Sequence, residues 1–156
     1  MKKKILSILM AVMLCISGAF WGDFETQAKE LGEDIDYSYL LSDSALIGYA
    51  DLQTRGVYLL SGHSIIEKIS STKIGAGGVT SAAKACKVTV VSIVERQTST
   101  GWAFVTSWSQ TNENAYSAMI SKSLVVGSGY YYRVRSHHYA SSDASSSWTS
   151  ALWMGN

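Results

Sequence analysis

The chain has 156 residues, a length that suits one domain, and its 13 basic and 12 acidic residues give a formal charge of +1. This balance offers no clustered positive charge of the kind that nucleic-acid binding requires, and no polybasic patch for a membrane surface. We therefore expect neither nucleic acid nor a lipid surface as a partner of the folded domain.

Residues 1–28 are predicted to form a secretory signal peptide, an N-terminal helix that precedes the folded domain. Lysines at positions 2–4 precede an apolar run over residues 5–21, which is slightly short for a bilayer span of ~20 residues. Cleavage after Ala19 and cleavage after Ala28 both fit the small residues at those points, and an uncleaved membrane anchor is the alternative. The protein is expected to be secreted or at the cell surface, with membrane contact only through this segment.

An acidic leader, residues 29–45, follows the predicted signal peptide. Loss of residues 1–28 removes three lysines, Asp23 and Glu25, which leaves ten basic and ten acidic residues. It also removes Cys15, so Cys86 stands alone and cannot form an intramolecular disulfide. Cys86 is interpreted as a small buried residue, with an intermolecular bridge or a reactive thiol as alternatives.

Residues 46–156 have the pattern of an all-β domain. Short runs rich in β-branched and aromatic residues alternate with Gly, Ser, Thr and Asn clusters, which is typical of one antiparallel β-sandwich. The expected strands are 46–50, 56–62, 63–70, 73–78, 87–97, 101–110, 117–126, 130–140 and 146–154.

Two of these segments carry specific expectations. Residues 101–110 alternate so that one set of side chains should face the core: Trp102, Phe104, Thr106 and Trp108. The glycine-rich stretch GAGGVTSAA, residues 75–83, lacks a phosphate-binding pattern and is interpreted as a turn or bulge.

Period-two alternation divides the strand at 130–140 into two rows. The inward row is expected to be Tyr130, Tyr132, Val134, Ser136 and His138. The outward row is expected to be Tyr131, Arg133, Arg135, His137 and Tyr139. Aromatic and cationic side chains on one face could stack on sugar rings or hold a peptide, and a solvated face without a ligand is the alternative. Trp148 and Trp153 are possible companions near the closing strand.

The sequence lacks the common catalytic and metal-binding signatures. His137 and His138 are adjacent, so they should point to opposite faces, and no HExxH or Cys-x-x-Cys motif occurs. No GxSxG motif is present, and Glu95 is expected to face solvent beside Arg96. The sequence predicts no enzyme, no metal site and no cofactor.

Two resemblances extend this interpretation. The stretch SKSLVVGSGYYYRVRSHHYASSDASSSWTSALW resembles the last two strands of a fibronectin type III module, which implies an immunoglobulin-like or fibronectin III-like sandwich. ALIGYA, RGVYLLSGHSII, GAGGVTSA, VERQ and SSSWTSALW resemble an uncharacterised family of small secreted proteins of Gram-positive bacteria. That family implies secretion and a single domain, and no catalytic residues.

The predicted function is a secreted, non-catalytic module that binds a glycan, a cell-envelope polymer or a protein through the outward row. A structural or adhesive protein whose sheet edges assemble is the alternative, followed by a small hydrolase.

Overall fold

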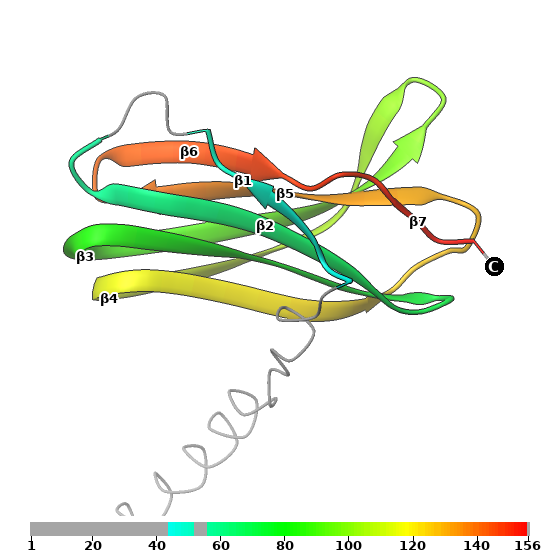
Figure 1. Cartoon of the computed structure of the whole chain (residues 1–156), viewed down its shortest axis with the longest axis horizontal. Coiled ribbons are helices and arrows are strands. Elements are labelled where there is room, and N and C mark those ends of the chain that lie inside the picture. Colours follow the sequence, from blue (N-terminus) through cyan, green and yellow to red (C-terminus); the bar gives the residue numbers. More distant parts are fainter. Residues whose placement is uncertain (1–43, 52–55, 156) are drawn as a thin grey trace, which may run out of the picture. The chain divides into compact units, whose positions relative to one another are not determined.

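The computed structural model describes residues 44–51 and 56–155, and within them the regular structure is antiparallel β-strand (Figure 1). The strands are β1 Leu46–Tyr49, β2 Leu59–Ser70, β3 Lys73–Thr98, β4 Gly101–Val125, β5 Tyr131–Ala140, β6 Asp143–Trp148 and β7 Leu152–Trp153. The predicted signal peptide and nearly all of the acidic leader lie outside the described residues. Within those residues, no helix is long and apolar enough to span a membrane.

The two longest strands, β3 and β4, organise the sheet. Irregular pairing between Ser81 and Val88 bends β3 into a first arm, residues 73–81, and a second arm, residues 86–98. The first arm pairs with β2 and the end of β4, whereas the second arm pairs with the start of β4 and with β5. The bend lets one strand serve two parts of the sheet without leaving the hydrogen-bonded ladder.

All seven strands belong to one sheet, in the order β1-β2-β3-β5-β6, with β4 beside β3 and β7 beside β5. The sheet curls until β1 and β2 lie against β6 and β5, so that it is nearly closed (Figure 1). The predicted all-β, antiparallel class is confirmed. An immunoglobulin-like or fibronectin III-like sandwich stays a prediction.

The prediction of a turn or bulge at 75–83 is wrong for residues 75–80, which pair residue by residue with β2 and β4, whereas the pairing of β3 with β4 becomes irregular after Ser81. Glycine is needed there for close packing instead. A Cβ atom on Gly78 would lie 2.6 Å from the hydroxyl oxygens of both Ser92 and Ser136. The glycine thus lets the first arm of β3 approach the opposite part of the curled sheet.

Other boundaries also differ from the expected ones. The runs expected at 73–78 and 87–97 are one strand, β3, and those expected at 101–110 and 117–126 are one strand, β4. The two strands expected at 56–62 and 63–70 are one strand, β2, while the closing run 146–154 is divided between β6 and β7. At that division Thr149 Oγ1 accepts a hydrogen bond from Val134 N at 3.1 Å. The side chain replaces a main-chain ladder bond, and the chain beyond it turns so that Met154 is fully buried.

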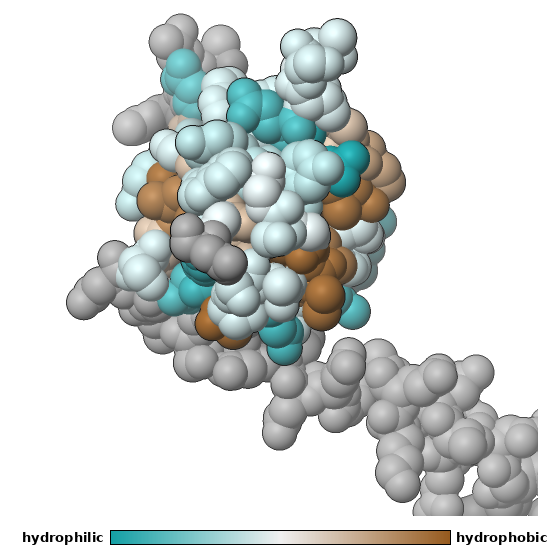
Figure 2. Space-filling model, turned by 90° about the vertical axis from the view of Figure 1, so that its right-hand side faces the viewer, coloured by the Kyte–Doolittle hydropathy of each residue, from teal (hydrophilic) through white to brown (hydrophobic). Residues whose placement is uncertain are grey.

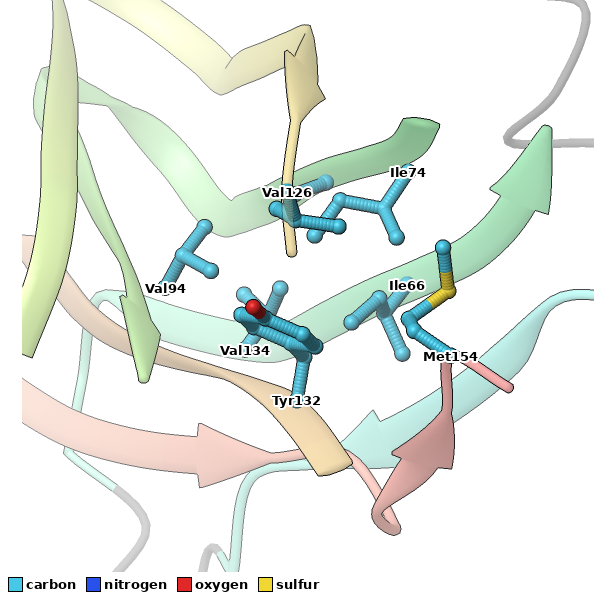
Figure 3. Packing of buried hydrophobic residues seen from close by; sticks show 8 residues of the cluster. Ile66, Ile74, Val94, Val126, Tyr132, Val134 and Met154 are labelled. Carbon is cyan, nitrogen blue, oxygen red and sulfur yellow. The ribbon is translucent and has the colours of Figure 1, made fainter. Parts of the chain in front are cut away.

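The core consists of two apolar clusters. The first contains Ile66, Ile74, Ala76, Val94, Val126, Tyr132, Val134 and Met154, whose side chains converge in Figure 3. The second contains Leu59, Ala82, Val88, Val90, Ala118, Ile120 and Ala140. Trp108 packs against both clusters. Fully burying one such aliphatic side chain stabilises a fold by about 1.5–3 kcal/mol.

Buried polar side chains separate the two clusters. Ser136 and His138 on β5 lie between Val134 of the first cluster and Ala140 of the second, and all of these residues are buried. Ser64 on β2 and Ser92 on β3 occupy the equivalent positions of their strands. Burial of these groups is tolerated because their hydroxyl and imidazole groups bond to one another across the sheet.

Candidate functional site

The alternation predicted for β5 is confirmed along the strand. Tyr132, Val134, Ser136, His138 and Ala140 are buried, whereas the predicted outward row is exposed or half-buried throughout. The Tyr132 hydroxyl donates to the Gly127 carbonyl at 3.1 Å, which anchors the turn before the strand. The prediction that Tyr130 faces inward is wrong. This residue precedes β5, is 44% exposed, and has the Arg96 guanidinium 4.6 Å from its ring centroid.

Glu95 lies at the centre of the outward face and is held between two arginines of β5. Its Oε2 lies 2.7 Å from Arg133 Nε, and its Oε1 lies 3.2 Å from Arg135 Nη2. The expectation that Glu95 faces open solvent beside Arg96 is wrong, since only 6% of Glu95 is exposed. Glu95 and Arg133 are directly opposite in the ladder, so the guanidinium covers the carboxylate.

The hairpin that joins β3 to β4 brings two further rings to this face. Val94 pairs with Thr106 and Glu95 pairs with Phe104, so Val105 is an extra residue in β4. This bulge reverses the alternation of residues 101–104, which lie between Val105 and the hairpin turn.

The core-face prediction for this hairpin is therefore right for Thr106 and Trp108 and wrong for Trp102 and Phe104. The Arg133 guanidinium lies 4.3 Å from the centroid of Trp102, and Phe104 is 66% exposed. The tip of the hairpin projects from the rest of the sheet in Figure 1.

Tryptophans on β6 and β7 complete the face on its other side. Trp148 lies opposite Arg135 in the ladder and is 58% exposed. Trp153 lies opposite Tyr131, and their ring centroids are 4.8 Å apart at an interplanar angle of 47°. The two companions expected from the sequence are thus brought to the outward row of β5.

The remaining members of the row lie nearer the other end of β5. His137 Nδ1 lies 2.8 Å from Ser146 Oγ, and Tyr139 is half exposed at the end of the strand. We call the whole surface the β5 platform. It comprises Trp102, Phe104, Tyr131, Arg133, Arg135, His137, Tyr139, Trp148 and Trp153, with Glu95 beneath the arginines. Figure 2 looks onto the end of the domain that lies on the right in Figure 1, and it shows apolar and hydrophilic side chains interspersed there.

Trp102, Phe104 and Glu95 were not among the site residues predicted from the sequence. The signal that could have placed Trp102 and Phe104 is weak: residues 87–97 are apolar on both faces, which either a central strand or a bulge would explain. No sequence signal pairs Glu95 with Arg133, because the ladder register decides that contact.

A serine–histidine pair lies inside the domain. Thr80 Oγ1 donates to the Thr89 carbonyl at 3.1 Å, so it accepts from His138 Nδ1 at 2.8 Å. His138 Nε2 is then the acceptor for Ser147 Oγ–H, also at 2.8 Å, and Ser64 Oγ lies 2.6 Å from Ser147 Oγ.

The 2.8 Å between Ser147 Oγ and His138 Nε2 would suit a nucleophile and its general base, but both residues are inaccessible to solvent. Both His138 and Ser147 are buried, and burial lowers the pKa of His138 to about 4. Because Ser147 is buried, no substrate can reach its hydroxyl in this arrangement. The chain of hydrogen bonds instead links β5 to β2, β3 and β6.

Asp143 and Cys86 have contacts that stabilise the fold. Asp143 Oδ2 accepts from Tyr58 N at 2.6 Å and Leu59 N at 3.0 Å, and these bonds lower the pKa of its carboxyl. Cys86 is a free, half-buried thiol packed against the second cluster. In residues 44–51 and 56–155, no three His, Cys, Asp or Glu side chains gather as a group that could hold a metal ion.

Comparisons with known proteins give little functional information. No curated protein matches the sequence. Among solved structures, the chain is similar to CsgH of R. palustris, determined in solution, with 15% identity and a TM-score of 0.37 over 54% of this chain and 86% of that one. A model described as a family of unknown function, DUF6147, matches residues 37–152.

Proposed function

The chain belongs to the DUF6147 family, whose function is unknown. From the β5 platform we propose that the protein is a secreted, non-catalytic module that binds a glycan or a cell-envelope polymer. Membership of an uncharacterised family agrees with the resemblance found in the sequence. Secretion, a Gram-positive source and a fibronectin III-like topology are parts of the same proposal.

The observation that supports binding is the arrangement of exposed rings around paired arginines. Trp148, Trp153 and Phe104 expose about half or more of their surface. Tryptophan and tyrosine faces stack on the C–H faces of sugar rings, and a guanidinium donates hydrogen bonds to hydroxyl or carboxylate oxygens.

The arginines are held before a ligand arrives. Glu95 engages Arg133 through Nε and Arg135 through Nη2, and Trp102 supports the Arg133 guanidinium from one side. The Nη groups of Arg133 can still donate to a ligand. Side chains fixed in this way lose less conformational entropy on binding, which favours affinity without a conformational change.

The test is a binding screen of the purified protein against glycans and cell-wall polymers. We expect Tyr131→Ala, Arg133→Ala and Trp148→Ala each to weaken binding about tenfold or more, which corresponds to about 1.4 kcal/mol. Tyr116→Ala is the matched control, because this tyrosine is 64% exposed and lies on β4 away from the platform.

Two results would count against the proposal. Equal binding by the platform variants and by Tyr116→Ala would place the ligand elsewhere on the domain. Capture of a protein but of no polysaccharide, with the same dependence on Arg133 and Trp148, would replace the carbohydrate by a protein ligand.

A further inference from the structure

The outer edge of β4 is the longest strand edge of the described domain. Within the described residues β3 is the strand that pairs with β4, and no other strand packs extensively beside it. The strands at the two ends of the sheet order, β1 and β6, are short, and they approach each other near Gly48 and Trp148. A long edge of this kind presents main-chain N–H and C=O groups that only water or another strand can satisfy.

The part of this edge at residues 101–112 lacks the usual protection against strand addition. It contains no Asp, Glu, Lys, Arg or Pro, and it is rich in Ser, Thr and aromatic residues. Charged side chains and proline are the common devices that prevent edge-to-edge pairing. Its one irregularity is the extra residue Val105, which leaves residues 106–112 as a regular stretch.

Two side-chain amides of this stretch bond to main-chain carbonyls of β4, one within the stretch and one beyond its end. Gln110 Nε2 donates to the Thr111 carbonyl at 3.3 Å, and Asn112 Nδ2 donates to the Ser117 carbonyl at 2.9 Å. These contacts occur on the surface, so an incoming strand can replace them at little cost.

We propose that residues 102–112 of β4 pair antiparallel with the same residues of a second copy of this chain, so that Ser107 lies opposite the Ser107 of that copy. Two identical uncharged strands bring no like-charge repulsion to their interface, and each supplies the donors and acceptors that the other lacks. A twofold axis perpendicular to the sheet relates the two copies, because opposite residues in an antiparallel ladder share a face. The interface is therefore a continuation of the sheet from β3 through both β4 strands.

This symmetry has a consequence for the platform. Phe104 and Trp102 lie on the outward face of β4, and the perpendicular twofold axis keeps that face on the same side in both copies. The dimer thus presents two platforms on one continuous surface, which suits a ligand with repeating units. The pairing itself depends on the β4 edge alone and goes beyond the proposed binding function.

The experiment measures molar mass by light scattering over a range of concentrations of the purified protein. We expect the mass to rise from monomer to dimer, and Ser107→Lys to raise the dimer dissociation constant at least tenfold. Ser107 is exposed on β4, and two copies of the new lysine would face each other across the interface. Ser99→Lys is the matched control, since Ser99 is exposed in the turn before β4 and lies off the edge.

Circular dichroism and the melting temperature show that both variants are folded. Hydrogen exchange of the amides in 102–112 should slow as the concentration rises in the parent protein and should not slow in Ser107→Lys. A monomer at every concentration would overturn the proposal. A dimer that Ser107→Lys and Ser99→Lys affect equally would also overturn it, because association would then use another segment.

Discussion

Arg133 Nε lies 2.7 Å from Glu95 Oε2, and this ion pair joins β5 to β3 at the centre of the outward face. The same guanidinium lies 4.3 Å from the Trp102 ring centroid, so one side chain connects the strand, the carboxylate and the hairpin. The geometry of the β5 platform therefore depends on a residue, Glu95, that is itself nearly inaccessible to a ligand.

Glu95→Gln tests this dependence. The amide keeps the shape of the carboxylate but leaves both Arg133 and Arg135 without their negative partner. Since the arginines are partly exposed, we expect the free energy of unfolding to fall by about 1–2 kcal/mol, less than for a fully buried pair. Urea denaturation measures this change, and the affinity for any platform ligand should fall with it.

Glu113→Gln is the control for that substitution. Glu113 pairs with Lys87 at 3.0 Å on the surface, where both side chains are more than half exposed. An exposed pair contributes less than about 1 kcal/mol, so this change should be close to neutral. If the two variants lost the same stability, the Glu95 pairs would have no special structural role.

The buried His138 makes stability depend on pH. Its pKa is about 4 in the folded protein and about 6.5 in the unfolded chain, so the unfolded state binds a proton more readily. This contribution is fully present above pH 6.5 and declines as the pH falls toward 4. Between pH 7 and pH 5 we expect a loss of about 2 kcal/mol in the free energy of unfolding.

Urea denaturation at several pH values measures that loss. His138→Gln should remove most of it, whereas His137→Gln should retain it because His137 is partly exposed and bonds to Ser146 on the surface. His63 contributes a smaller loss of the same sign, since burial lowers its pKa as well. A pH dependence that His138→Gln leaves unchanged would contradict the assignment.

Ser147→Ala tests the hydrogen-bond chain across the interior. The hydroxyl that it removes lies 2.8 Å from His138 Nε2 and 2.6 Å from Ser64 Oγ, and both atoms would be left buried without this partner. We expect a loss of about 1–3 kcal/mol in the free energy of unfolding. Ser146→Ala, one residue away on the outward face, should cost less, and thermal denaturation of the two variants compares them directly.

Gly48→Ala tests the close approach of β1 to the end of β6. A Cβ atom at this position would overlap the main-chain carbonyl of Trp148, and a backbone atom cannot rotate away. Overpacking of this kind destabilises a fold by about 1–3 kcal/mol. Gly127→Ala is the control, because its Cβ would meet the Tyr132 hydroxyl at an ordinary 3.6 Å. Comparable melting temperatures for the two variants would show that β1 can move away from β6.

Much of the fold could be predicted because period-two alternation follows directly from strand geometry. The rows of β5 were assigned correctly from Tyr131 to Tyr139, since this strand is regular and unbulged over its length. Between the hairpin turn and Val105 the same reasoning failed, because one extra residue turned Trp102 and Phe104 to the outward face. A bulge reverses the alternation on one side of it relative to the other, and its position depends on the partner strand.

The glycines of the stretch 75–80 were misassigned to a turn or bulge for a related reason. Glycine is common in turns, but here Gly78 serves the contact with Ser92 and Ser136 from two other strands. The partners that make glycine necessary are distant in sequence, so composition alone could not distinguish a turn from a crowded strand.

By itself, the sequence determined that this is an all-β domain and which side chains of β5 alternate, because both follow from local periodicity and turn chemistry. The tertiary structure alone decided that Glu95 is covered by Arg133 and Arg135, and that rings from the hairpin, β6 and β7 meet on one face. The Glu95–Arg133 contact joins residues 38 positions apart, and strand register rather than sequence spacing brings them together.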